Sequence, residues 1–184
     1  MCNPVLLPIY HMLVMRTKGC YLLYFIIMFV LSGCPFPEEP MPLSAYQPVL
    51  MSREQLEKSI ALKEPRIISN PGKLYHYGSY ILINELFEGI HIIDNKKPEA
   101  PVTIGFIQVP GNVDFAVKDV VIYVDNAVDL VALDFTSPSS IQVTKRIRNT
   151  FPALLPPDDL PFENNWAGAP KDAVIVGWEL VNSK

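Results

Sequence analysis

The sequence lacks the short motifs on which most recognisable enzyme sites are built. It has no G-x-S-x-G elbow, no H-E-x-x-H zinc helix, no phosphate-binding loop and no G-x-G-x-x-G turn. The templates for serine hydrolases, zinc enzymes and nucleotide-binding enzymes therefore have no anchor residues here. We expect no cofactor and no metal, and a non-enzymatic protein.

Acidic residues are missing from the first 33 positions, and this absence divides the chain in two. All 19 acidic residues follow Cys34, together with 13 of the 15 basic ones, so that part carries a net charge of −6. A surface of this sign repels phosphate backbones. We expect no nucleic-acid partner, and at 184 residues we expect one modest domain.

The leader, residues 1–33, has the charge order of a secretory signal peptide. Arg16 and Lys18 precede an uncharged stretch whose apolar centre is residues 21–31. This run of 11 residues is too short to cross a bilayer, which takes about 20. Counting from Met15 gives a signal peptide of ordinary length, so we expect translation to start there. An uncleaved anchor is the alternative.

Cysteine is scarce, and the one cysteine beyond the leader has a specific context. The segment Leu31-Ser32-Gly33-Cys34 resembles the bacterial lipobox, in which the cysteine is lipid-modified and becomes the first mature residue. Two or three acyl chains anchor a protein stably where one does not. We predict that Cys34 binds the chain to a lipid bilayer, a free thiol being the alternative. No disulfide is then possible within the mature chain.

A proline-rich, acidic segment follows the cysteine. Residues 35–42 include four prolines and two glutamates, a composition that stays extended, so residues 34–51 are predicted to be a tether. Inner-membrane lipoproteins often have aspartate directly after the cysteine, whereas Pro35 and Phe36 stand here. By that resemblance we expect a bacterial cell-envelope protein, with the outer membrane favoured.

The rest of the chain has the pattern of short strands. Ser52 and Gln55 have capping-box spacing, which predicts a short helix over residues 52–62 within a helix-and-linker segment, 52–72. Residues 73–151 are rich in Ile, Val and Tyr broken by turn residues. A proline-rich loop and a terminal strand, 173–181, complete the region 152–184.

The strand region repeats itself at an offset of 40 without gaps. Residues 80–85 align with 120–125, and residues 90–94 align with 130–134, so that two strands end in Asp94 and Asp134. A period of this length holds about four strands, the size of one propeller blade. The pattern predicts a mainly β fold with two blade-like, four-stranded antiparallel units, a short N-terminal helix and a C-terminal strand.

Those two strands resemble the segment that names the LVIVD repeat, and the body is similar to bacterial surface lipoproteins that carry it. The resemblance implies a propeller-like architecture and no particular reaction. A closed ring needs about four blades, or roughly 160 residues, and too few remain after the leader. The propeller should therefore be incomplete: an open assembly, a shortened gene product, or a protomer that completes its sheets with another copy.

Side chains with possible chemistry have structural explanations that we favour. Asp94 and Asp134 are expected to satisfy turn amides. Asp125, Asn126 and Asp129 are spaced closely enough to offer oxygen ligands to Ca²⁺, with Glu85 and Glu88 in the sister unit, but they match no calcium loop. His76 and His91 are expected to be packing or edge residues rather than metal ligands.

The proline-rich loop, residues 154–166, mixes apolar side chains with acids. Leu160, Phe162 and Trp166 are our candidates for a partner-contact loop, an ordinary surface loop being the alternative, and Trp178 is expected in the core. The favoured function is a membrane-anchored binding or interaction module with a protein or glycan partner, or with a second copy. The alternative is an envelope hydrolase or lyase with catalytic residues on propeller loops.

Overall fold

The computed structural model describes residues 41–163 and 168–181, so the leader, Cys34 and Trp166 lie outside it. The described part contains helix α2 (Arg53–Glu57) and eleven strands. The strands are β1 (Tyr46–Met51), β2 (Ala61–Lys63), β3 (Pro71–Tyr77), β4 (Tyr80–Glu85), β5 (Gly89–Asp94), β6 (Val102–Gln108), β7 (Phe115–Lys118), β8 (Val121–Asn126), β9 (Asp129–Ser137), β10 (Ser140–Ile147) and β11 (Val174–Leu180).

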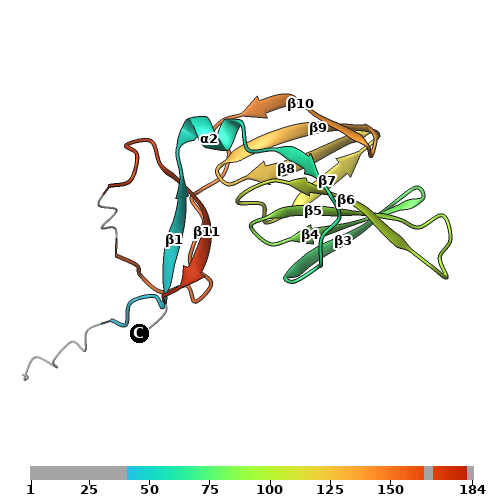
Figure 1. Cartoon of the computed structure of the whole chain (residues 1–184). Coiled ribbons are helices and arrows are strands. Elements are labelled where there is room, and N and C mark those ends of the chain that lie inside the picture. Colours follow the sequence, from blue (N-terminus) through green and yellow to red (C-terminus); the bar gives the residue numbers. More distant parts are fainter. Residues whose placement is uncertain (1–40, 164–167, 182–184) are drawn as a thin grey trace, which may run out of the picture. The chain divides into compact units, whose positions relative to one another are not determined.

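The prediction of a mainly β fold built from antiparallel strands is confirmed. The first sheet has the order β2-β6-β5-β4-β3, and the second sheet has the order β10-β9-β8-β7 (Figure 1). Strands β1 and β11 form a separate two-stranded ribbon. Apart from β2, each of the two larger sheets is therefore a meander of four consecutive strands.

Tight hairpins produce these meanders. Two residues close the β3–β4, β7–β8 and β8–β9 pairs, and the first of the two has positive φ in each case: Gly78 at 57°, Asp119 at 54° and Ala127 at 56°. This left-handed backbone matches the twist of antiparallel strands. The β4–β5 connection has three residues, 86–88, and its central Phe87 also has positive φ.

The two sheets face each other across one apolar core. The face of each sheet that points toward the other is called its inner face, and the opposite face its outer face. Aliphatic residues and two phenylalanines fill the space between the inner faces, where Ile92 and Leu133 are fully buried, as predicted. The main members are Leu82, Ile90, Ile92, Ile107 and Val109 from the first sheet, and Phe115, Ile122, Val124, Val131, Leu133 and Phe135 from the second.

The internal repeat is visible in the strand register, with one correction. Strands β5 and β6 correspond to β9 and β10 at an offset of 40, because Ile90 pairs with Ile107 as Leu130 pairs with Ile147. Strands β3 and β4 correspond to β7 and β8 at an offset of 41. The ungapped alignment is therefore wrong by one residue there, because the first unit has the longer hairpin loop.

Asp94 and Asp134 are equivalent in this register, and each carboxylate accepts the backbone N–H two residues later. The distances are 2.9 Å to Lys96 and 2.8 Å to Thr136. Their predicted use in satisfying backbone amides is confirmed. The predicted position of Asp134 at a strand end is wrong, because β9 continues to Ser137.

The helix is shorter than the spacing predicts. The Ser52 hydroxyl accepts the Gln55 N–H at 3.2 Å, and the Gln55 side chain accepts the Ser52 N–H at 2.9 Å, so the capping box is formed. The helix nevertheless ends at Glu57, and β2 occupies residues 61–63 by pairing with β6. No helix among the described residues is long and apolar enough to cross a bilayer.

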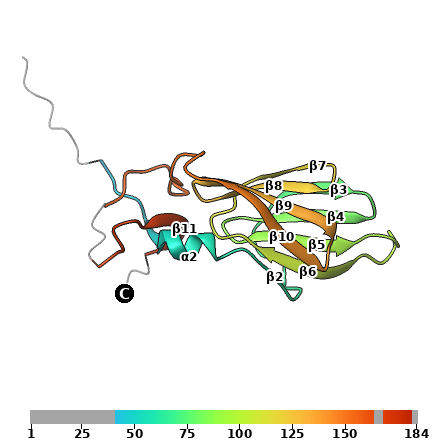
Figure 2. The same cartoon turned by 90° about the horizontal axis from the view of Figure 1, so that it is seen from above.

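The β1–β11 ribbon joins the two ends of the described chain. Residues 46–51 were expected in the tether, but they pair with β11 from Tyr46 opposite Leu180 to Met51 opposite Val174 (Figure 1). Helix α2 lies beside β11 in the view from above (Figure 2). Val174 and Val176 pack with Leu56 and Ala127 in a second apolar cluster. The ribbon is thereby packed against α2 and the β8–β9 turn.

The core assignment is testable by truncation. Replacing Ile92 by Ala should lower the free energy of unfolding by about 2–5 kcal/mol, because the fully buried site leaves a cavity. Val143→Ala, at an exposed valine of β10, and Asp134→Asn should each cost distinctly less. Urea unfolding followed by circular dichroism measures all three. Equal losses for Ile92→Ala and Val143→Ala would contradict the assignment.

Candidate functional site

The proline-rich loop is fixed to the beginning of the described chain by one carboxylate. Asp158 accepts hydrogen bonds from the Ser44 hydroxyl at 2.9 Å and from the Ala45 N–H at 3.0 Å. The Ser44 N–H also donates to the Pro161 carbonyl at 2.7 Å. Desolvation raises the pKa of Asp158, but the N–H groups of Ala45 and Leu160 and the Ser44 hydroxyl outweigh it and lower that pKa overall.

Two surface hollows lie along this clamped loop and share Phe162. One, of about 470 Å³, is also lined by Leu43, Tyr46 and Val181. The other, of about 480 Å³, is lined by Met41, Leu155 and Leu160, among others. Phe162 packs edge-on against Trp178, with 4.9 Å between ring centroids, and the predicted burial of Trp178 is confirmed.

Large apolar side chains stay exposed around these hollows. Met41 is 70% exposed and Leu155 is 68% exposed, while Leu43 and Val181 each expose more than half of their surface. Asp159 and Glu163 place carboxylates among the lining residues. We call these side chains, with Leu160 and Phe162, the apolar patch. Such a surface can contact apolar and basic groups of a partner.

The structure brings together two of the three predicted contact residues. Leu160 and Phe162 line the second hollow, while Trp166 lies outside the described residues. Met41, Leu43 and Val181 were missed by sequence reasoning. They reach the loop through the Asp158 clamp and the β1–β11 pairing, neither of which leaves a local signal in the sequence.

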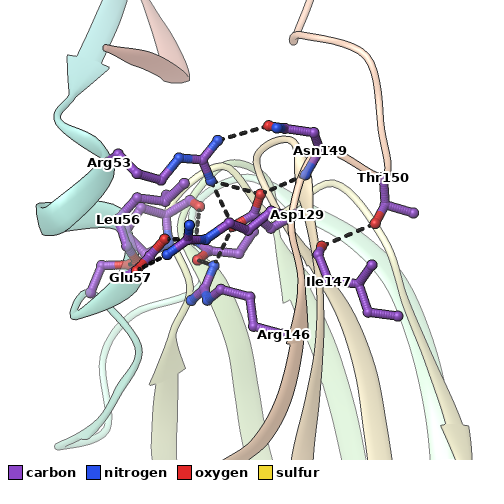
Figure 3. Close-up of polar contacts among 12 residues, drawn as sticks. Arg53, Leu56, Glu57, Asp129, Arg146, Ile147, Asn149 and Thr150 are labelled. Carbon is purple, nitrogen blue, oxygen red and sulfur yellow. Dashed lines mark hydrogen bonds and ion pairs between the residues drawn. The ribbon is translucent and has the colours of Figure 1, made fainter. Parts of the chain in front are cut away.

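Asp129, which sequence reasoning weighed as a calcium ligand, is fully buried in an ion-pair network (Figure 3). Its two oxygens accept hydrogen bonds from Arg53 at 2.7 Å, from Arg146 at 2.8 Å and from the Asn149 N–H at 3.0 Å. Arg146 also donates to the Asn126 side chain at 2.8 Å. The oxygens of Asn126 and Asp129 therefore bind guanidinium groups rather than converging on a position that a calcium ion could occupy.

This network attaches the helix to the second sheet. Arg53 is the first residue of α2, and Glu57 at its other end pairs with Arg148 at 2.8 Å. Burial raises the pKa of Asp129, but the Arg53 guanidinium, the Asn149 N–H and the Arg146 guanidinium outweigh it, so that pKa lies below its usual range. Asp129 is therefore ionised at neutral pH and serves the fold.

Glu85 and Asp125 have the same structural role in the two units, since each accepts backbone N–H groups just before the first strand of its meander. Glu85 accepts the N–H groups of Ser69 and Asn70, just before β3. Asp125 accepts those of Val113 and Asp114, just before β7. Burial raises the pKa of Asp125 despite these hydrogen bonds. Burial also acts to raise the pKa of Glu85, but the Asn70 N–H, His91 and the Ser69 N–H outweigh it, so the pKa of Glu85 is lowered.

The two histidines and the remaining candidate acid also have structural surroundings. His91 is fully buried, with Nε2 at 3.0 Å from Glu85 and its ring against Phe106. His76 lies exposed on β3, and Glu88 pairs with Arg66. Among the residues that the structure describes, no three His, Cys, Asp or Glu side chains are grouped in a way that could hold a metal ion.

The network around Asp129 predicts an acid-sensitive contribution to stability. Asp129→Asn should cost about 3 kcal/mol at pH 7, because it leaves two partly buried guanidinium groups without their anion. Since folding lowers the pKa of Asp129, its contribution is fully present above about pH 4 and is lost as the pH falls through the lower, folded-state value.

Urea unfolding between pH 7 and pH 3 measures this effect. The stability difference between the wild type and Asp129→Asn should narrow as the pH falls. Glu54→Gln is the control, because it breaks an exposed ion pair with Lys58 and should leave stability nearly unchanged. A difference that stays constant down to pH 3 would show that the charge of Asp129 is not what matters.

No protein-family model matches the chain, and no match was found among curated proteins or among solved structures.

Proposed function

We propose that this protein is a lipid-anchored bacterial envelope protein that acts as a non-enzymatic binding module. The observation that carries the proposal is the apolar patch around Phe162, which lies where the predicted tether enters the described fold. Exposed apolar surface of this kind costs solubility and is typical of contact sites. The outer membrane is the favoured location, by the residues that follow Cys34.

The length of the tether supports a contact close to the membrane. Seven positions separate Cys34 from Met41, and a chain of that length spans at most about 25 Å. An acylated Cys34 would therefore keep Met41, one residue of the apolar patch, within that distance of the bilayer. The partner should be another component of the envelope.

The chemistry of the patch supports a protein partner over a glycan. Its lining is mainly aliphatic and aromatic, and its polar groups include the carboxylates of Asp159 and Glu163. Leu155 and Met41 would enter apolar pockets of the partner, while the two carboxylates would meet basic groups at the rim. A glycan would make little use of Met41 and Leu155, because these exposed apolar side chains offer no hydrogen bonds to sugar hydroxyls.

We also infer that the two larger sheets are propeller-like blades, as the resemblance to LVIVD repeats implies. The support is the strand register, which relates the two meanders by a head-to-tail repeat. In such a repeat each sheet presents the same face in the same direction. The two sheets would be consecutive blades of a ring that this chain alone does not complete.

The anchor is tested by metabolic labelling with an alkynyl fatty acid. The wild type should be tagged and recovered with membranes, while Cys34→Ser should lose the tag, because only that thiol lies in the lipobox-like segment. Cys20→Ser is the matched control and should keep the tag. Label that persists in Cys34→Ser would refute lipidation at this position.

The patch is tested by affinity isolation from the envelope of the source cells. The double variant Met41→Ser, Leu155→Ser should lose a stoichiometric partner at least about tenfold, because two exposed apolar contacts are removed. Val120→Ser, in the β7–β8 turn, removes an exposed apolar side chain elsewhere and should retain the partner. Turnover of envelope polymers by the purified protein would instead favour an enzyme.

A further inference from the structure

We propose that a second copy of this chain docks head to tail on the first, the outer face of the second sheet of one copy packing against the outer face of the first sheet of the other. Two such contacts would close a ring of four sheets. The proposal adds a second contact surface, separate from the apolar patch, and rests on the blade-like interpretation of the sheets that is part of the proposed function. It does not require lipidation of Cys34.

The strand register carries this inference. Leu82, Ile90, Ile92 and Ile107 form the buried inner face of the first sheet. Their equivalents in the second sheet are Tyr123, Leu130, Ala132 and Ile147, which all lie on its outer face. The second sheet therefore directs outward the same face that the first sheet buries.

The outer face of the first sheet shows the reverse relation. Leu74, Ile81, Ile83 and Ile93 lie there, and their equivalents in the second sheet are Phe115, Ile122, Val124 and Leu133. All four of those equivalents are buried in the core. The two outer faces thus correspond to the two halves of an interface that the chain already makes internally.

Both outer faces keep apolar side chains in contact with solvent. On the second sheet Tyr123 is 39% exposed and Ile147 is 47% exposed. On the first sheet Leu74 is 62% exposed, and Ile81 and Ile93 are partly exposed. A β-sheet with one face in the core normally directs polar residues to its other face. Apolar residues on both faces are expected of sheets that are covered on both sides.

Charge at the start of the strands supports the same partner. Lys73 and Asp114 stand directly before the equivalent residues Leu74 and Phe115, and they form an ion pair at 3.1 Å across the internal interface. A second copy stacked by the same repeat would bring its own Lys73 next to Asp114. Opposite charges would then alternate from sheet to sheet around the ring.

The segment between β2 and β3 limits the area of the contact. Ser69 and Asn70 bind Glu85, and Arg66 stacks on Phe106, so this segment covers one end of the outer face of the first sheet. The uncovered part carries Leu74 and Ile81. Ile67 on the covering segment is itself 85% exposed and adds apolar surface beside it.

Two copies are favoured because the contact joins unlike surfaces. Heterologous contacts form open filaments unless the rotation closes a ring. About four blades are the fewest that close a propeller, and two copies supply four sheets. A two-copy ring also covers both outer faces of each chain, which an open chain of copies would leave exposed at its ends.

Engineered cysteine pairs, joined by a short bis-maleimide, test the contact in the full-length protein. Tyr75 and Phe115 meet across the internal interface with 6.4 Å between ring centroids, and their equivalents are Ala116 and Leu74. The repeat therefore brings Ala116 of one copy next to Leu74 of the other. Within one chain these two side chains point away from each other on opposite outer faces, with the core between them, so a short crosslinker cannot join them.

The double variant Leu74→Cys, Ala116→Cys should form a covalent dimer with the bis-maleimide, because facing sheets lie about 10 Å apart with their side chains directed at each other. The yield should exceed that of either single variant at least about tenfold, because a single variant places only one engineered cysteine at each contact. The double variant Leu74→Cys, Ser139→Cys is the matched control, because Ser139 is exposed in the β9–β10 turn and not on the docking face. This control variant should stay monomeric. Adding Tyr123→Lys to the Leu74, Ala116 pair should reduce the dimer about tenfold or more, because an unpaired charge would be buried.

Four results would overturn the proposal. The Leu74→Cys, Ala116→Cys variant could stay monomeric, or Ala116→Cys alone could form the dimer. The other two results are a series of higher oligomers and a crosslink to a different protein. Cys34→Ser in the same background should leave the crosslink unchanged. A protein that forms the crosslink but carries no fatty-acid label would refute the lipid anchor and support the ring. The failure of one proposal can therefore be told from the failure of the other.

Discussion

The packing of two antiparallel sheets around one apolar core is the interaction on which the rest of this structure depends. Each sheet alone would expose Leu82, Ile92 or Leu133 to water, and burying an aliphatic side chain of that size is worth about 1.5–3 kcal/mol. The hairpin turns hold the strands in the register that brings these side chains together. Contacts made by the ribbon, the helix and the loop are built on this pair of sheets.

Two buried carboxylates and one half-buried carboxylate satisfy polar groups at the edge of the apolar core. Asp129, Glu85 and Asp125 all lie at the hairpin ends of their sheets, and each satisfies N–H or guanidinium donors of a segment that enters or leaves a meander. The Arg53–Asp129 pair ties the helix to the second sheet (Figure 3). Acidic residues that look like metal ligands in the sequence are therefore used to connect segments of the chain.

Apolar surface is left exposed in two separate places, and each place is assigned a different partner. The patch around Phe162 lies beside the point where the tether enters, which favours an envelope partner close to the membrane. The outer faces of the sheets carry the equivalents of core residues, which favours a second copy. An assembled protein could use both surfaces together, because the ribbon and its loop are not part of either sheet face.

Sequence by itself determined the β class, the repeat near 40 residues, the capping box at Ser52 and the burial of Ile92 and Leu133. These follow from local alternation and spacing, which act over a few residues. Tertiary structure alone decided where the helix ends and which residues contact Asp129, namely Arg53 and Arg146. It also decided that residues 46–51 form a strand with β11 rather than part of the tether. Such contacts join residues as far apart as Tyr46 and Leu180, 134 positions along the chain, and their partners are chosen by packing rather than by any pattern in the neighbouring sequence.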